Sequence, residues 1–363
     1  MNLRRRDFLG ALGASGLAVG LVAGFGELIG YALRLTSGYV ADRTARYWAI
    51  TLVGYAINLL AVPSLALAGR WETAAALMVA ERIGKAIRTP ARDAMLSHAT
   101  KEVGHGWGFG LHEAMDQAGA MIGPLVVAAA LAAGWGVRAG FGLLLVPALL
   151  ALGVLIAAWR AYPRPADLEP IGTEWPHDGR AFPRIFWVYL AAAGLVAAGY
   201  ADFALIAYHL DHRRVIPTDG IPVLYAIAMG VEGAAALAFG RLFDRYGMAV
   251  LVASVVLAAP FAPLVFLGHV PAAVAGMVLW GAGMGAQQTI LKAVIATIIP
   301  PDRRASAYGL FNAGFGLAWF LGSALMGYLY DASPVGLVVF SVLAHFAAIP
   351  LLMGVGGRVG IGR

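Results

Sequence analysis

The sequence predicts an all-α membrane protein, folded as a polytopic bundle of helices. Of its 363 residues 60% are hydrophobic and only 13% are charged, whereas soluble domains average about 45–50% and about 25%. Residues 140–159 and 249–267 contain no charge at all, and blocks of about 20 apolar residues match the hydrocarbon core of a bilayer. Because backbone polar groups in lipid must pair internally, and the alternation typical of barrel strands is missing, these blocks are expected to be helices.

Eleven stretches along the chain have the length and composition of a membrane span. Their expected limits are 16–38, 47–69, 72–97, 108–133, 139–159, 184–209, 220–240, 248–268, 271–297, 306–330 and 334–354. The longest polar interruption, 161–183, is rich in proline and mixed charges. We therefore expect a solvated linker there, between an N-terminal half (1–160) and a C-terminal half (184–363).

Basic residues in the loops predict the orientation. Fifteen Lys and Arg residues fall on the side of the linker and the C-terminus, against four on the other side, leaving aside Arg4–Arg6. The first side is therefore expected to be cytoplasmic. This topology explains the net charge of +6 without a nucleic-acid partner. We expect a monomer in a bacterial inner membrane, whose partners are the lipid bilayer and a small-molecule substrate.

The chain offers little to hold a cofactor. It has no cysteine, which excludes disulfides and thiolate metal sites. The Gly84-Lys85 pair lacks the preceding glycine spacing of a nucleotide-binding loop. We expect no cofactor or metal, no enzymatic activity, and a proton gradient as the energy source.

The two halves share a sequence motif. Gly38, Asp42 and Arg43 recur as Gly240, Asp244 and Arg245 at an offset of 202 residues, each time between two predicted spans at the cytoplasmic side. Repeated multi-span halves are typical of secondary transporters, whose binding site lies at the repeat interface. The second half has six predicted spans, but the first has only five.

The repeated loop resembles the signature of the major facilitator superfamily, a Gly-x-x-x-Asp-Arg-x-Gly-Arg-Arg loop between the second and third helices. Ala45 and Tyr47 depart from that pattern. The resemblance implies a two-half transporter that alternates between inward-open and outward-open states. Asp42 is expected to meet the positive N-terminus of the next helix and a neighbouring arginine, so that Arg43, Arg46 and Arg92 help it to close an inner gate.

The span missing from the pattern is the first one. Residues 1–15 contain only the short apolar run Phe8–Ala14. A start codon placed too late and a genuine eleven-span form both explain this, and the former is favoured because eleven spans would place Arg4–Arg6 outside. Arg5-Arg6-Asp7-Phe8-Leu9 also resembles a twin-arginine export signal, although the apolar stretch continues directly into the loop motif.

The stretch 72–97 carries several ionisable residues, although its length and its other residues suit a helix that crosses the membrane. Glu81, Lys85, Arg88 and Arg92 are spaced for one helix face, which must avoid lipid. Pro90 predicts a kink near its inner end. The segment resembles the family's fourth-helix motif, whose arginine is associated with proton coupling, and Arg82 is the matching position. Arg88, Arg92 and Asp93 have an alternative placement at the membrane surface, bracing Asp42.

The stretch 108–133 contains Gly110, Gly119, Gly123 and Pro124, which resemble the fifth-helix motif associated with antiporters. Small residues permit close helix packing, and Gly-Pro bends a span. Val127 and Ala128 replace the last glycine pair of that motif.

Further polar residues lie inside predicted spans and are candidates for a substrate or proton pathway. They are Glu27, Glu113, Asp116, Gln117, Asp202, Glu232, Gln288 and Lys292. We expect Glu81, Arg82, Lys85, Glu113 and Asp116 to form one polar network. An offset of 199 sets Asp93 against Lys292, which suggests an inter-half ion pair.

These observations predict a secondary transporter that moves a small solute, with proton-coupled efflux by antiport as the favoured mechanism. The basic stripe leaves open an anion-selective uniporter, symporter or exchanger. A membrane-embedded enzyme would need a clustered nucleophile or metal set, and the sequence shows none. A protein inactive in transport, for want of the first span, is the remaining alternative.

Overall fold

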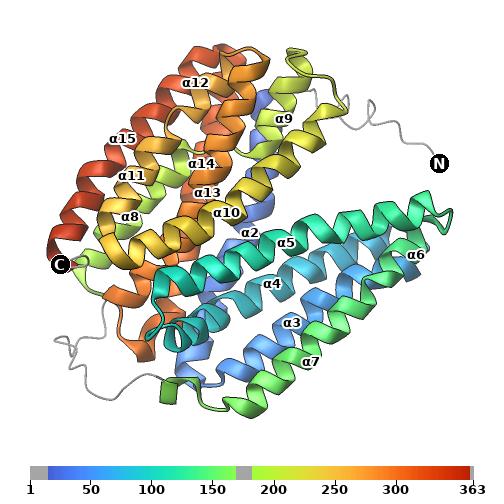
Figure 1. Cartoon of the computed structure of the whole chain (residues 1–363), viewed down its shortest axis with the longest axis vertical. Coiled ribbons are helices and arrows are strands. Elements are labelled where there is room, and N and C mark those ends of the chain that lie inside the picture. The colour runs from blue at the N-terminus through green and yellow to red at the C-terminus, as the bar shows by residue number, and fades with distance from the viewer. Residues whose placement is uncertain (1–14, 169–181, 360–363) are drawn as a thin grey trace.

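The computed structural model describes residues 15–168 and 182–359, and all regular structure among them is helical. The first part contains α2 (Gly16–Thr44), α3 (Tyr47–Ser64), α4 (Trp71–Ala99), α5 (His105–Ala132), α6 (Gly136–Leu143) and α7 (Leu145–Ala161). The second part contains α8 (Arg184–Gly199), α9 (Phe203–His212), α10 (Gly220–Tyr246), α11 (Met248–Ala258), α12 (Phe261–Phe266), α13 (Val270–Ile298), α14 (Arg304–Ala332) and α15 (Pro334–Val359). Figure 1 shows the two groups as neighbouring bundles that meet along α2, α5, α10 and α14.

Every predicted span coincides with one helix or a broken pair of helices, and the helical membrane fold is confirmed. Nine stretches of the described chain are long and apolar enough to cross a membrane. Helix α4 falls outside that set because any window of it contains too many ionisable residues. The predicted span 16–38 lies in α2, where the side chains of residues 19–29 are not described.

Three predicted spans are interrupted. The stretch 139–159 divides into α6 and α7, 184–209 into α8 and α9, and 248–268 into α11 and α12. Between α8 and α9 the backbone is extended at Tyr200 and Asp202, and the Asp202 carboxylate accepts a hydrogen bond of 2.8 Å from the Ala204 N–H at the start of α9. This break places the polar Asp202 inside the bundle rather than at its surface.

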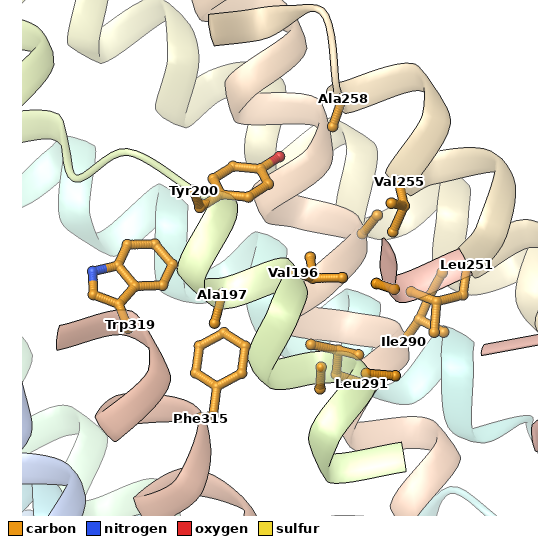
Figure 2. Packing of buried hydrophobic residues seen from close by; sticks show 14 of the residues in the cluster. Val196, Ala197, Tyr200, Leu251, Val255, Ala258, Ile290, Leu291, Phe315 and Trp319 are labelled. Atoms are coloured by element: carbon orange, nitrogen blue, oxygen red, sulfur yellow. The ribbon is translucent and has the colours of Figure 1, made fainter. Parts of the chain in front are cut away.

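The hydrophobic core is concentrated in the second bundle. Figure 2 shows side chains of α8, α11, α13 and α14 meeting there, with the Tyr200 ring on one side of α8 and Trp319 nearby. The Tyr200 ring stacks on Phe261, with centroids 5.1 Å apart. Half of the apolar window in 184–212 is buried, against only 6% in 136–161, so α6 and α7 present their apolar side chains to the surrounding lipid.

The two bundles contact each other through two antiparallel helix pairs. Helices α2 and α14 pack closely along their whole length, since a Cβ on Gly16 would crowd Gly327 and one on Gly38 would overlap Ala305. Helices α5 and α10 are in contact as far as Gln117 and Gly233, starting from the end where Gly106 lies against Gly240. We call this the inner end, because it is the predicted cytoplasmic side. Toward the outer end α5 and α10 diverge (Figure 1), and Gly119 and Gly123 have no neighbour within 4 Å of a built Cβ.

The turn after each copy of the repeated motif contains a residue with positive φ, but the two backbone conformations differ. Gly247 has φ +63° after α10, and Ala45 has φ +52° after α2. With ψ +18°, Ala45 lies in the left-handed region, at a cost of about 1 kcal/mol for a residue with a Cβ. Gly247, with ψ −143°, has a different conformation that favours glycine.

Replacing this alanine should relieve the strain. We expect Ala45→Gly to raise the thermal unfolding midpoint in detergent, since glycine adopts positive φ freely. The matched variant Ala76→Gly, in the interior of α4, should lower the midpoint because glycine costs about 0.5–1 kcal/mol there. A fall of similar size for both variants would show that Ala45 is not strained.

Candidate functional site

The first gate contact joins α2 to α14 at the inner end. The Asp42 carboxylate accepts hydrogen bonds from the backbone N–H groups of Ala305 (3.2 Å) and Ser306 (2.6 Å). These belong to the first turn of α14, whose N–H groups have no partner within the helix and carry partial positive charge. The Tyr47 hydroxyl donates a further hydrogen bond of 2.9 Å to Asp42.

The second gate contact repeats the arrangement with the bundles exchanged. Asp244, at the inner end of α10, accepts hydrogen bonds from the N–H groups of Gly106 (2.7 Å) and Trp107 (2.6 Å) in the first turn of α5. Gly240 and Gly106 permit this approach, because a Cβ on either would overlap the other's carbonyl oxygen. The repeated motif thus builds two equivalent latches, each reaching into the opposite bundle.

A third carboxylate holds the outer end of α2. Asp331, in the last turn of α14, accepts hydrogen bonds from Gly16 (2.7 Å) and Leu17 (3.0 Å) at the start of α2. Helices α2 and α14 are therefore joined at both ends, whereas α5 and α10 are joined only at the inner one.

Between the bundles lies a polar cavity of about 330 Å³. Its lining comprises Tyr31, Arg34, Lys85, Thr89, Arg92, His112, Glu113, Asp116, Gln117, Asp202, Phe203, Tyr225, Trp280, Met284, Gln288, Lys292, Asn312 and Trp319. Charged groups from α4, α5 and α13 lie toward the inner end. Aromatic side chains of the second bundle, among them Tyr225, Trp280 and Trp319, line the outer part.

A hydrogen-bonded network crosses the cavity from one bundle to the other. The Gln117 amide nitrogen lies 3.0 Å from a carboxylate oxygen of Glu113 and 3.0 Å from one of Glu232. The Lys292 ammonium lies 3.5 Å from the other Glu113 oxygen. Glu113 and Gln117 are on α5, Glu232 is on α10 and Lys292 on α13. Both carboxylates are buried, with 6% and 2% of their surface exposed, so this network is shielded from bulk solvent.

Arg34 is the cavity's cation from α2. Its guanidinium donates a 3.0 Å hydrogen bond to the Asn312 side chain and stacks over the Tyr31 ring at 4.2 Å. Its Nε atom is buried without a hydrogen-bond partner. No carboxylate among the described side chains pairs with it, so a guanidinium faces the cavity without an acidic counter-ion there.

Comparison with known proteins agrees with this architecture. A sequence model of the Major Facilitator Superfamily matches residues 7–248 and 216–356. The chain belongs to the major facilitator superfamily.

The relatives of this major facilitator protein cover nearly its whole length. An uncharacterized protein of Mycobacterium tuberculosis is 41% identical over 352 residues, covering 96% of this chain and 86% of the relative. An uncharacterized MFS-type transporter of Methanocaldococcus jannaschii is 23% identical over 94% of this chain and 87% of its own length. The solved structure of the human organic anion transporter MFSD10 superposes with a TM-score of 0.73 at 15% identity, covering 95% of this chain and 87% of that one.

Family membership makes the chain a multi-pass membrane protein and a secondary transporter of small molecules. It also identifies the two-bundle arrangement as the major facilitator fold. The cavity lies where transporters built from repeated halves bind their substrates.

The structure corrects the predicted composition of the inner gate. Asp42 binds the N-terminus of α14 in the other bundle, not that of the following helix α3. Arg92 pairs instead with its neighbour Asp93, at 2.6 Å, and Arg43 donates to the Tyr39 hydroxyl at 2.9 Å. Arg46 and Asp42, both described, form neither a hydrogen bond nor an ion pair with each other. Among the described residues, Asp42 is therefore held by helix N–H groups and the Tyr47 hydroxyl, and no arginine pairs with it.

The predicted polar network on α4 is also divided. Glu81 accepts a 2.7 Å hydrogen bond from Asn58 of α3, and the Arg88 guanidinium stacks over Tyr55 of the same helix at 4.2 Å. Lys85 and Arg92 line the cavity instead. Arg82 is exposed and lies outside the cavity lining.

Other predicted site residues have mixed outcomes. Asp116, Asp202 and Gln288 line the cavity, and their part in a substrate or proton pathway stays a prediction. Asp93 and Lys292 do not pair with each other, since Asp93 binds Arg92 and Lys292 binds Glu113. The side chain of Glu27 lies outside the described residues.

The glycine motif of α5 is used only in part. Gly110 packs tightly on Ala236 of α10, whereas a Cβ added at Gly119 or Gly123 would meet no described atom within 4 Å. Pro124 lies within α5, which continues as one helix to Ala132. Close packing against α10 is therefore restricted to the inner part of the helix.

Sequence reasoning missed Asp331, His112 and the role of Arg34. Arg34 carries an intramembrane charge, which is a signal of function in itself. His112 is an ionisable side chain inside a predicted span, again a recognisable signal. Asp331 sits at the junction of two spans and reads as an ordinary loop residue, so its contact with α2 could not be predicted.

Breaking the α5–α10 latch should open the inner end. In inside-out vesicles, a Thr89→Cys reporter in the cavity lining should react about tenfold faster with an impermeant maleimide when Asp244→Ala is added. This reflects the loss of charge-assisted hydrogen bonds worth about 1.5–3 kcal/mol each. The control Asp167→Ala removes an exposed carboxylate that pairs with Arg164. Equal labelling rates in the two variants would mean that Asp244 does not hold the gate.

Proposed function

We propose that this transporter is coupled to protons, and that Glu113, Gln117, Glu232 and Lys292 form its proton-binding site. The observation that carries the proposal is the single Gln117 amide bonded to two buried carboxylates from opposite bundles. With both carboxylates ionised the four side chains carry a net charge of −1, and one bound proton makes them neutral. Two like charges so close in a low-dielectric site favour binding of that proton.

The location of the network supports coupling to conformational change. Its members come from α5 on one side and from α10 and α13 on the other, so separation of the bundles breaks it. Repulsion between Glu113 and Glu232 opposes closure when both are ionised, whereas a shared proton removes it. Proton occupancy thus biases which end of the cavity is open, as alternating access requires.

We further propose that the protein is an antiporter that exports its substrate. It would act as a monomer in a bacterial inner membrane. Glu113 both lines the cavity and belongs to the network. A substrate that donates a hydrogen bond or a positive charge to Glu113 competes with the proton for the same oxygens, which is the condition for exchange. The partial resemblance of α5 to the antiporter motif supports the same mechanism.

Reconstituted protein tests this proposal. In proteoliposomes screened with radiolabelled solutes under an imposed pH gradient, Glu113→Gln and Glu232→Gln should each lower gradient-driven flux by about tenfold or more, equivalent to about 1.4 kcal/mol. Both variants should retain solute counterflow, because counterflow needs no net proton movement. Glu102→Gln, which alters an exposed carboxylate between α4 and α5, serves as control. Full driven flux in both network variants would refute proton coupling through this site, and no flux of any solute would refute transport.

A second candidate function, transport of anions, is favoured by Arg34. This guanidinium faces the cavity without a described acidic partner, and Asn312 and Lys292 lie in the same lining. An anionic group placed between them would satisfy the buried Nε atom and the Lys292 ammonium, which protonation of Glu113 releases. Anion and proton would then bind together rather than in competition.

Matched aromatic probes distinguish the two candidates. If anions are the substrates, benzoate should raise the unfolding midpoint of the purified protein more than benzamide or benzylammonium, and Arg34→Gln should abolish the difference. The control Arg70→Gln changes an exposed arginine paired with Glu72. A larger effect of benzylammonium, lost in Glu113→Gln, would favour proton antiport of cations and exclude anion selectivity.

A further inference from the structure

A groove larger than the central cavity lies at the inner end of the α5–α10 contact. It encloses about 1100 Å³. Its lining consists of Val103, Trp107, Ala234, Leu237, Ala238, Arg241, Leu242, Asp244 and Arg245. Ala234 and Ala238 lie one turn apart on α10 and are both exposed, which leaves an apolar channel along the helix.

Two arginines stand at the inner end of this channel. Arg241 and Arg245 are one helical turn apart on α10, and both are exposed. The Arg241 guanidinium lies 5.0 Å from the centre of the Trp107 ring, and that of Arg245 lies 5.2 Å from the Tyr246 ring. Neither forms an ion pair or a hydrogen bond with a described residue, so both guanidinium groups can bind a ligand in the groove.

This combination matches one kind of molecule. An apolar channel at membrane depth accepts an acyl chain, and basic residues at its cytoplasmic end attract an anionic headgroup. Tryptophan is the side chain that favours the level of the headgroups. A free inorganic anion would use the arginines but leave the channel between Ala234 and Leu242 uncovered.

We propose that the groove between α5 and α10 binds an anionic phospholipid of the cytoplasmic leaflet, whose phosphate contacts Arg241 and Arg245. The site is separate from the transport cavity and does not depend on the proton-coupling proposal. The site adjoins the gate, because the backbone N–H of Trp107 donates a 2.6 Å hydrogen bond to Asp244. A lipid that spans Arg241 on α10 and Trp107 on α5 therefore stabilises the closed inner latch.

The equivalent gate provides an internal comparison. At the offset of 202, Tyr39 stands in place of Arg241 and Arg43 in place of Arg245. There Arg43 already donates a 2.9 Å hydrogen bond to the Tyr39 hydroxyl, and Ser306 occupies the first-turn position that Trp107 has in α5. The α2–α14 gate thus lacks the second arginine and the indole, which makes lipid binding a property of one gate only.

Lipid titration of the purified protein tests the proposal. Dioleoylphosphatidylglycerol should raise the unfolding midpoint and appear as a retained adduct in native mass spectrometry, more than dioleoylphosphatidylcholine does. Arg241→Gln should weaken the apparent affinity for phosphatidylglycerol about fivefold, while the control Arg160→Gln, at the inner end of α7, should bind like the wild type. Unfolding midpoints in phosphatidylcholine alone show whether each variant is folded.

Three results would overturn the proposal. Equal stabilisation by the two lipids would remove the charge selectivity, and an unchanged affinity in Arg241→Gln would place the lipid elsewhere. Stabilisation by inorganic phosphate equal to that by phosphatidylglycerol would assign a simple anion site. As a second expected result, phosphatidylglycerol should slow maleimide labelling of Thr89→Cys from the inner side in the wild type but not in Arg241→Gln.

Discussion

The closed inner end depends on one interaction, used twice: a carboxylate that accepts hydrogen bonds from the first N–H groups of a helix in the opposite bundle. Those N–H groups have no partner within their own helix, and they carry the positive end of the helix dipole. Asp42 accepts hydrogen bonds from the first N–H groups of α14, and Asp244 accepts them from those of α5. Because each aspartate belongs to one bundle and each helix start to the other, separating the bundles at this end leaves both a carboxylate and a helix terminus without partners.

The latches also fix the depth of the polar network. Glu113 lies seven residues after Gly106 on α5, which is about 10 Å along a helix that rises 1.5 Å per residue. Any movement of the start of α5 is therefore transmitted to Glu113, and through Gln117 to Glu232 on the facing helix. The outer parts of α5 and α10 already diverge, so the structure has a closed inner end and a cavity whose aromatic part extends outward.

Much of the fold could be predicted from the sequence, because the physical constraints are local. Backbone pairing in lipid requires helices, and runs of apolar residues show where they cross. The repeat of Asp42 as Asp244 predicted two equivalent loops, and the family resemblance predicted a gate at Asp42. The residues that Asp42 binds could not be predicted, since Asp42 and Ala305 are 263 residues apart in the sequence. The spacing of residues within one helix does not indicate which residues of the opposite bundle it contacts.

The same limit applies to the stripe on α4. Spacing shows that Glu81, Lys85, Arg88 and Arg92 share one face, but neighbours decide what that face meets. In the structure this face of α4 lies partly against helix α3 and partly against the cavity. Glu81 and Arg88 contact α3, while Lys85 and Arg92 face the cavity. Likewise, Glu113, Gln117, Glu232 and Lys292 were each recognised as intramembrane polar residues, yet only the fold brings the four together.

The central claim, that protonation of this network sets which end is open, can be measured as a distance. The chain has no cysteine, so spin labels at Leu125→Cys on α5 and Val223→Cys on α10 report the separation of the outer ends by double electron–electron resonance. The account predicts a longer distance at low pH, where the shared proton keeps the inner end closed. It predicts a shorter one at high pH, and no pH response in Glu113→Gln/Glu232→Gln. A distance that does not change with pH, or that changes equally in the double variant, would contradict it.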